Sequence, residues 1–316
     1  YKRQAGYFAG GKDFTYTSDH MYVSGGNSSS RKNLTVMKKE QIDDFTKLNV
    51  DFDDFDLDIR TSDDDHYYME YKLEKNGRKN PLTWKDKDGE LTLEESAGGS
   101  GSYYITYDLG IFSTHADLTE TKDALNTVIL YIPEKAQLSE AELQLSDGDL
   151  TADQLLCKEM TLELLNGDLM LDKGEFEKFD AKLSDGDLNV KELQCTDNMQ
   201  LKSGNGDVTI KKAELADGQI ALSDGDIQID NSSFNGDMKI NSSCGDVSVE
   251  MKNGSAEKTN IYLKATDGDV DTEGLSRGKT DNEEDTSVYE NKAGASAPTL
   301  NVECSDGDIT LTESEK

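Results

Sequence analysis

The chain has 316 residues, of which 65 are acidic and 33 are basic, so its formal net charge is -32. This charge excludes a nucleic-acid-binding module, because such a surface repels a phosphate backbone. Only 34% of the residues are hydrophobic, which is low for a compact domain and indicates a thin, elongated β architecture. The longest apolar run, Val128 to Pro133, is far shorter than the roughly 18 residues of a membrane span.

Residues 1–44 are predicted to be a leader that is rich in Gly and Ser and partly disordered. The run from Gly25 to Ser30 is typical of such a segment. The sequence begins at Tyr1 rather than at methionine. We therefore expect a signal peptide or membrane anchor to precede it in the full-length protein.

Residues 45–135 are predicted to form irregular coils of a β-solenoid, with insertions that loop out. The segment Phe55-Asp56-Leu57-Asp58-Ile59 has an apolar residue at every second position, and degenerate copies follow at Gly89 and Ala116. The spacings from Phe55 to Gly89, from Gly89 to Ala116 and from Ala116 to Gly148 are 34, 27 and 32 residues, which exceed the later period. A strand from Val128 to Ile132, stopped by Pro133, leads into the regular coils.

Residues 136–316 contain an internal repeat, which is the strongest signal in the sequence. A Gly-Asp-apolar triplet recurs at intervals of 19, 19, 20, 19, 20, 23 and 39 residues, and the last interval is read as two periods. Its glycines are Gly148, Gly167, Gly186, Gly206, Gly225, Gly245, Gly268 and Gly307.

Each period begins with a turn and continues as a short strand, because the residues two and four places after the glycine are nearly all apolar and point to one face. A second, weaker corner follows about twelve residues after each glycine. A unit of this size cannot bury its apolar face alone, but stacked coils can. The prediction is an all-β, single-stranded parallel β-solenoid, or β-helix, with 19–20 residues per coil over residues 45–316. A division into two domains near residue 135 is the alternative.

The Gly-Asp corner has a conformational reason, since glycine adopts positive φ freely and Asp or Asn bonds to nearby main-chain amides. The corner aspartates should form a ladder with neighbours about 4.8 Å apart, so the carboxylates must be hydrated, bonded to amides or bridged by cations. Solvated turn residues are the main interpretation, and a Ca²⁺ ladder is the alternative. Its members would be Asp149, Asp168, Asp187, Asp207, Asp226 and Asp246, with Asp269 and Asp308 continuing the series.

The tyrosines and cysteines have structural interpretations. Tyr67, Tyr68 and Tyr71, with Tyr103, Tyr104 and Tyr107, could form a stacking surface for a glycan or protein, although alternating tyrosines on strands usually pack. Trp84 stands alone.

The four cysteines, Cys157, Cys195, Cys244 and Cys304, are predicted to be free thiols. Cys157 and Cys195 lie two coils apart, and Cys244 and Cys304 about three, which is too far for a disulfide.

The sequence resembles the putative-adhesin family of bacterial surface proteins, which is common in Gram-positive species. The likeness rests on the Ser-Asp-Gly-Asp units at Ser146, Ser184, Ser223 and Ser305, on Val128 to Pro133 and on Phe55 to Ile59. It covers roughly residues 45–316. The resemblance implies an extracellular β-solenoid, often behind a membrane anchor, and supplies no catalytic residue or cofactor.

We therefore expect a non-catalytic cell-surface protein that acts in adhesion or as an envelope-associated interaction module. Its partner would be a glycan or a protein, and the chain would be a monomer or a weak oligomer. One alternative is a carbohydrate-active enzyme, which would need a single carboxylate pair with separated pKa values. Another is an assembly or sensor module that joins through exposed end coils.

Overall fold

The computed structural model describes residues 13–16, 21–24, 33–97, 125–272, 275, 278–283 and 285–315. In chain order, its strands and single short helix are β1 (Asp13–Tyr16), β2 (Met21–Ser24), β3 (Leu34–Ile42), β4 (Lys47–Phe52), β5 (Asp56–Ser62), β6 (Tyr67–Glu74), β7 (Leu82–Lys87), β8 (Glu90–Glu95), β9 (Thr127–Pro133), β10 (Leu138–Leu145), β11 (Leu150–Asn166), β12 (Leu169–Asp185), β13 (Leu188–Asn205), β14 (Val208–Lys211), β15 (Ala213–Asp224), β16 (Ile227–Phe234), β17 (Met238–Cys244), β18 (Val247–Met251), the 3-10 helix η2 (Ala256–Lys258), β19 (Asn260–Thr266), β20 (Val270–Asp271), β21 (Lys279–Glu283), β22 (Thr286–Asn291), β23 (Thr299–Asp306) and β24 (Ile309–Glu313). The helix is too short to cross a membrane, and no other helix in these residues could do so.

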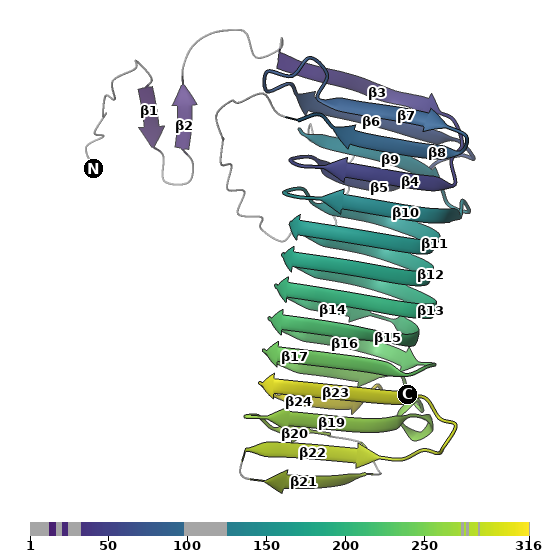
Figure 1. The fold of residues 1–316 in the computed structure, drawn as a ribbon, viewed down its shortest axis with the longest axis vertical. Coiled ribbons are helices and arrows are strands. Elements are labelled where there is room, and N and C mark those ends of the chain that lie inside the picture. Colours follow the sequence, from purple (N-terminus) through teal and green to yellow (C-terminus); the bar gives the residue numbers. More distant parts are fainter. Residues whose placement is uncertain are drawn as a thin grey trace.

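The strands from β3 onward stack into a rod, so the predicted β-solenoid is confirmed (Figure 1). Each regular coil carries a strand segment before the Gly-Asp corner, a short one after it and a third that returns to the next coil. We call the three resulting surfaces the pre-corner, post-corner and return faces. In β12 and β13 they are represented by the pairs Ala181–Leu201, Leu169–Leu188 and Phe176–Cys195.

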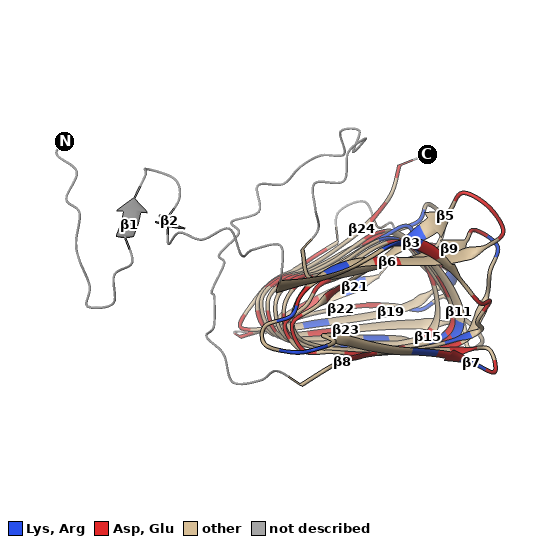
Figure 2. Cartoon of the chain, turned by 90° about the horizontal axis from the view of Figure 1, so that it is seen from above, with Lys and Arg blue, Asp and Glu red and all other residues tan. Residues whose placement is uncertain are grey.

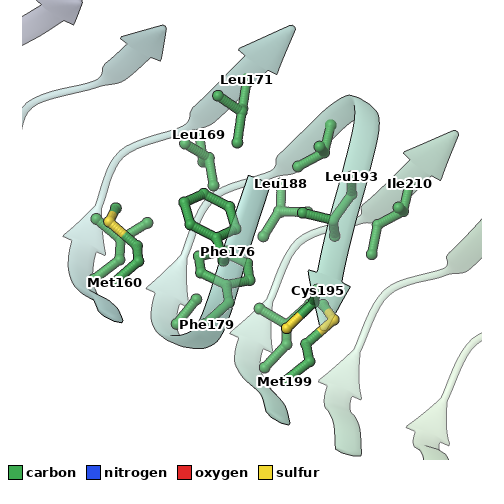
Figure 3. Packing of buried hydrophobic residues seen from close by; sticks show 14 of the residues in the cluster. Met160, Leu169, Leu171, Phe176, Phe179, Leu188, Leu193, Cys195, Met199 and Ile210 are labelled. Atoms are coloured by element: carbon green, nitrogen blue, oxygen red, sulfur yellow. The ribbon is translucent and has the colours of Figure 1, made fainter. Parts of the chain in front are cut away.

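A single apolar column fills the rod, because alternate residues of every segment point inward. In β13 the inward side chains include Leu188, Val190, Leu193, Cys195 and Met199, all buried. The column is continuous between coils, as Figure 3 shows for β11 to β14. Phe176 and Phe179 stack across its width with ring centroids 4.9 Å apart. A core one side chain deep therefore accounts for the low apolar content of the sequence.

Acidic and basic residues occur all along the coils (Figure 2), and neighbouring coils form ion pairs between some of them. Lys178 and Lys182 bind Glu159 and Glu163 of the preceding coil, each with a nitrogen–oxygen distance of 2.9 Å. All four side chains are more than half exposed. Such pairs contribute little to stability individually, but they hold the coils in register.

The difference between 19- and 20-residue coils is absorbed at the second corner. Cys195 pairs with both Phe176 and Leu215, and Asn198 pairs with both Lys178 and Asp217. One extra residue therefore bulges out of β13 at Thr196-Asp197 while the strands on either side keep their register.

At the C-terminal end, the order of coils differs from the order of the sequence. The coil of β23 and β24 lies between the coil of β17 and β18 and that of β19 and β20. The spatial order of corner glycines is therefore Gly245, Gly307, Gly268. Reading the final interval as two further periods was wrong, because the chain first forms the outer coil and then returns to fill the position inside it.

The N-terminal end has the same kind of exchange. The coil of β4 and β5 lies between β10–β11 and the outer coil of β8 and β9. Strands on the two sides of residue 135 thus pair directly. The sheet also begins before residue 45, since β3 pairs antiparallel with β6. Residues 34–42, which were assigned to the leader, are therefore part of the fold, whereas the glycine- and serine-rich run from Gly25 to Ser30 lies outside the described residues.

Antiparallel strands complete both ends of the rod. At the N-terminal end, β6 pairs with β9, and β7 pairs with β8. At the other end β22 pairs with β19, and β21 with β22. The expectation of regular coils up to residue 316 is corrected here, because residues 252–298 contain η2, an antiparallel hairpin and its connections.

Candidate functional site

The corner aspartates form a ladder in which each carboxylate binds the next main chain. Oδ1 of Asp149 accepts a hydrogen bond from the amide of Asp168 at 2.9 Å, and Oδ1 of Asp168 accepts one from Asp187 at 2.9 Å. The same bond recurs along the rod through Asp207, Asp226, Asp246, Asp308 and Asp269, and it begins at Asp56, which accepts from Asp149. The sequence left three possibilities for these carboxylates: hydration, bonding to amides and bridging by cations. The structure shows that they bond to amides.

From Asp149 onward, the glycine before each ladder aspartate is required because the coils approach too closely for a side chain. A Cβ atom on Gly167 would lie 2.2 Å from the carbonyl oxygen of Gly148, and one on Gly186 would lie 2.1 Å from that of Gly167. Positive φ, the predicted reason, holds at Gly186, with φ of 139°, but Gly148 and Gly167 do not adopt it. Close approach of the main chains is thus the reason shared along the ladder.

A second column stands two residues before the first, and from Asp147 to Asp224 it alternates Asp with Asn. Asn166 Nδ2 donates to Asp147 Oδ1 at 2.7 Å, and Asn205 Nδ2 donates to Asp185 in the same way. Placing an amide between two carboxylates supplies donors and reduces repulsion between like charges. The substitution of Asn for Asp in this repeat therefore does more than preserve turn chemistry.

The ladder repeats one arrangement at every coil, which suits a structural role. Among the described residues, no group of three or more His, Cys, Asp and Glu side chains is placed to hold a metal ion. Each Oδ1 atom from Asp149 to Asp246 already accepts a hydrogen bond from a main-chain amide of the next coil.

A different cluster, confined to the N-terminal end, interrupts this regularity on the post-corner face. Tyr68 of β6 lies directly opposite Tyr131 of β9, and Arg60 of β5 lies opposite Tyr131 on its other side. Gln41 of β3 completes the row beside Tyr68. These side chains point outward, since their sequence neighbours Met69, Leu130 and Ile59 are buried. We call this row the tyrosine platform, defined as Gln41, Tyr68, Tyr131 and Arg60.

Polar groups fix the two rings of the tyrosine platform. The Tyr131 hydroxyl donates to Glu70 Oε1 at 2.6 Å, and the Tyr68 hydroxyl donates to Asp64 Oδ2 at 2.8 Å. The Lys39 ammonium nitrogen lies 3.6 Å from the Tyr131 ring centroid and 5.0 Å from that of Tyr68, which is a cation–π geometry. The exposed side of the two rings is thus in contact with the ammonium group of Lys39.

Burial and hydrogen bonding explain the pKa shifts of the tyrosine platform. Burial, followed by the bond to Glu70, raises the pKa of Tyr131 to about 12, so its hydroxyl stays protonated as a donor. The bond to Asp64 is the main cause of the raised pKa of Tyr68. Burial raises the pKa of Asp58 as well, and Arg60 opposes this by donating to its Oδ2 at 2.6 and 2.9 Å.

The carboxylates around this row all have protein partners. Asp56 accepts from the Asp149 amide and from Thr127, and Asp58 accepts from Arg60. Glu70 accepts from Tyr131, and Asp153 accepts from the Thr61 amide at 3.2 Å. Their raised pKa values at Asp56 and Asp58 follow from burial. Each of these carboxylates therefore holds a side chain or a main-chain amide of the row, or of the strands beside it, in place.

The sequence matches the Toastrack DUF4097 family over residues 45–312. The chain belongs to the Toastrack DUF4097 family. A search of curated proteins gives no match.

Several solved structures are similar to this chain. One described as a putative adhesin from Parabacteroides merdae is 16% identical, covers 90% of this chain and 97% of its own, and superposes with a TM-score of 0.51. A putative adhesin and a putative lipid binding protein from Parabacteroides distasonis are 17% and 13% identical, with TM-scores of 0.44 and 0.47. They cover 89% and 90% of this chain, and each is covered over 97% of its length. At these identities the likeness concerns the fold alone.

Within this Toastrack chain, the predicted aromatic set divides. Tyr68 belongs to the tyrosine platform, whereas Tyr67 points inward and packs on Phe45 with ring centroids 4.8 Å apart. Tyr71 is packed against the core, and Tyr103, Tyr104 and Tyr107 lie outside the described residues. Sequence analysis missed Tyr131 and Lys39. Tyr131 lies within the apolar run from Val128 to Pro133, and its outward position follows only once period-2 alternation is applied to Val128, Leu130 and Ile132.

The cysteines of the Toastrack rod are free thiols. Cys157 and Cys195 are two coils apart with Phe176 between them, as predicted. Cys244 and Cys304 are not three coils apart but in neighbouring strands, offset by two residues, since Cys304 pairs with Ser242. Cys304 points inward and is buried, whereas Cys244 is exposed.

Proposed function

We propose that this Toastrack chain is a non-catalytic binding protein of the bacterial cell surface, and that the tyrosine platform contacts its ligand. The observation that carries the proposal is the outward pair Tyr68–Tyr131, flanked by Gln41 and Arg60 on four adjacent strands. At the corresponding outward positions, the coils that follow the tyrosine platform present small polar side chains, such as Thr151, Asn189 and Thr209, and the exposed Met170.

The ligand class that fits best is a glycan. Tyrosine rings offer an apolar face to the C–H side of a sugar ring, while Gln41, Arg60 and the nearby carboxylates can exchange hydrogen bonds with hydroxyl groups. Protein-held carboxylates give the surface a fixed geometry, which reduces the ordering cost of binding. The adhesin names of similar solved structures agree with a surface role but do not identify a ligand.

A glycan array probed with the purified chain tests this proposal. We expect binding to a limited set of glycans and at least a tenfold loss of affinity for Tyr68→Ala and for Tyr131→Ala. Tyr262→Ala is the matched control, because Tyr262 is also an outward, half-buried tyrosine but lies on β19 at the opposite end of the rod. If the two platform variants bind as well as the control variant does, the ligand site lies elsewhere.

Lys39 provides a second, independent measurement. Its ammonium lies over the same ring faces that a sugar would cover, so Lys39→Ala should expose them and leave glycan binding equal or tighter. A loss of binding in Lys39→Ala would instead indicate an anionic ligand held by the lysine. The cellular location is tested separately, since an antibody against the rod should label intact cells.

A further inference from the structure

The C-terminal coil occupies a slot one coil wide between two coils that precede it in the sequence. Strands β23 and β24, residues 299–313, pair on one edge with β17 and β18 and on the other with β19 and β20. Their inward side chains Leu300, Val302, Ile309 and Leu311 are fully buried. The slot therefore binds an extended peptide of defined sequence through main-chain bonds on both of its edges and an apolar lining.

The connection into this coil crosses over a strand. Strand β22 is antiparallel to β19, whereas β23 is parallel to β19 on its other side. Residues 292–298 must consequently pass over β19 to join them, and residues 292–296 are exposed. Residues of this linker and of the neighbouring strands, among them Tyr262, Gly294, Ala295 and Thr299, line a groove of about 550 Å³. Packing thus contributes little to holding the linker in place.

One side chain, Asn260, fastens the linker instead. Its Nδ2 donates to the carbonyl oxygens of Gly294 at 2.9 Å and Ala297 at 3.0 Å. Its Oδ1 accepts from the amides of Ala293 at 3.0 Å and Gly294 at 3.2 Å. The Asn260 amide also donates to the Pro298 carbonyl oxygen at 2.8 Å, and that bond does not depend on the side chain.

We propose that the slot is an interaction surface for a second copy of this chain, and that Asn260 limits exchange of the C-terminal coil between copies. The second copy is the partner because residues 299–313 already complement the slot. Supplied by another molecule, they would keep the bonds from the amide of Thr299 to Asp237 Oδ1 and from the amide of Asp308 to Asp246 Oδ1. Once released, the seven residues 292–298 can extend to about 23 Å, which lets one copy reach the slot of its neighbour.

The first test compares full-length Asn260→Ala with Asn189→Ala, an asparagine-to-alanine control at an exposed position on β13. Each protein is incubated over a range of concentrations at a temperature that partly opens the fold, then cooled and measured by size exclusion with light scattering. Asn260→Ala should form dimers at a concentration at least tenfold lower than the control. If Asn260→Ala melts normally yet stays monomeric throughout, the proposal is wrong.

The second test asks whether the dimer uses the slot. The Lys239 Nζ and Glu303 Oε1 atoms are 3.9 Å apart and join β17 to β23, so a zero-length carbodiimide reagent can link them. In dimers formed from equal amounts of ¹⁴N- and ¹⁵N-labelled chains, about half of the Lys239–Glu303 cross-linked peptides should combine one light and one heavy partner. Cross-links confined to one isotope would show that the dimer forms through another surface and would overturn the exchange.

Discussion

Oδ1 of Asp187 accepts a hydrogen bond from the main-chain amide of Asp207, 2.8 Å away in the next coil. This contact replaces a strand-to-strand main-chain bond at the point where the chain turns, and the turn would otherwise leave an amide without a partner. It explains why an acidic residue recurs at a position where like charges stack.

The aspartate ladder predicts that the hydrogen-bond acceptor of a corner aspartate contributes more to stability than its negative charge does. Asp187→Ala removes the acceptor for the Asp207 amide and should lower the free energy of unfolding by about 1–2 kcal/mol. Asp187→Asn keeps an oxygen acceptor and removes one negative charge, so its stability should lie within about 0.5 kcal/mol of the parent. Urea denaturation followed by circular dichroism measures both variants. Equal losses in the two would show that the charge, and not the hydrogen bond, is what the fold needs.

The glycine column predicts a steric effect that exceeds the conformational one. In Gly206→Ala the new Cβ would lie 2.2 Å from the Gly186 carbonyl oxygen, and φ is 118°. Since neighbouring coils must separate to admit it, we expect a loss of more than about 3 kcal/mol or a failure to fold. Gly254→Ala is the control, because φ is 76° there but no atom lies within 4 Å; its cost should be about 1 kcal/mol. Similar melting temperatures for the two variants would argue against close approach as the reason for glycine.

A buried ion pair at the N-terminal end predicts that loss of a buried cation lowers stability far more than loss of an exposed one. The Arg78 and Glu95 side chains are 6% and 1% exposed and bind each other, while Glu95 Oε2 also accepts from the amides of Asp53 and Asp54. Arg78→Ala leaves the Glu95 carboxylate buried without its cation and should cost about 3–5 kcal/mol. Lys87→Ala, which breaks an exposed pair with Asp88, should change stability by less than about 0.5 kcal/mol. Thermal unfolding of both variants would decide, and a small effect at Arg78 would contradict the assigned burial.

The thiols should differ in reactivity. Burial raises the pKa of Cys157 to about 12 and raises those of Cys195 and Cys304, so iodoacetamide should label Cys244 in the native protein and the other three only after unfolding. Peptide mass spectrometry with and without denaturant measures this. Rapid native labelling of Cys157 would contradict the inward position.

The raised pKa of Cys157 also makes the free energy of unfolding depend on pH. The unfolded Cys157 thiol loses its proton near pH 9 and the folded one near pH 12, so its contribution to stability is complete below pH 9 and falls as pH rises toward 12. The free energy of unfolding of the parent protein and of Cys157→Ser, measured over this range, isolates the effect, because serine carries no thiol to titrate. An equal fall in stability for the two proteins between pH 9 and pH 12 would contradict the assignment to Cys157.

The sequence predicted the coil, its period and its corner, because each rests on local chemistry. Gly148-Asp149 and its repeats mark turns, and alternation after them marks strands. The order of the end coils was not predictable in this way. Leu300 and Val302 fit the inward column beside either Met238 or Leu263, and spacing alone cannot say which coil the chain chooses as neighbour.

The tyrosine platform was predictable only in part. Tyr68 is visible in a strand of alternating residues, but Tyr131 is hidden among Val128, Ile129, Leu130 and Ile132. Their meeting depends on an antiparallel pairing of β6 with β9, which brings together segments separated by residues 75–126. The hydrogen bonds of Asn260 to residues 293–297 likewise depend on the linker crossing over β19. Nothing in the repeat indicates that crossing.

The exchanged coils at the ends also bear on mechanical load. A strand at the edge of a stack peels away one hydrogen bond at a time, but β23 is paired along both edges, with β17 and with β19. Force applied to the chain beyond Glu313 can peel the end of β24 from β18, but at β23 it must shear bonds on two sides together. At the other end, a pull transmitted through β3 meets β4, which is also held on both sides. A rod built this way would yield under tension in large, cooperative steps rather than coil by coil.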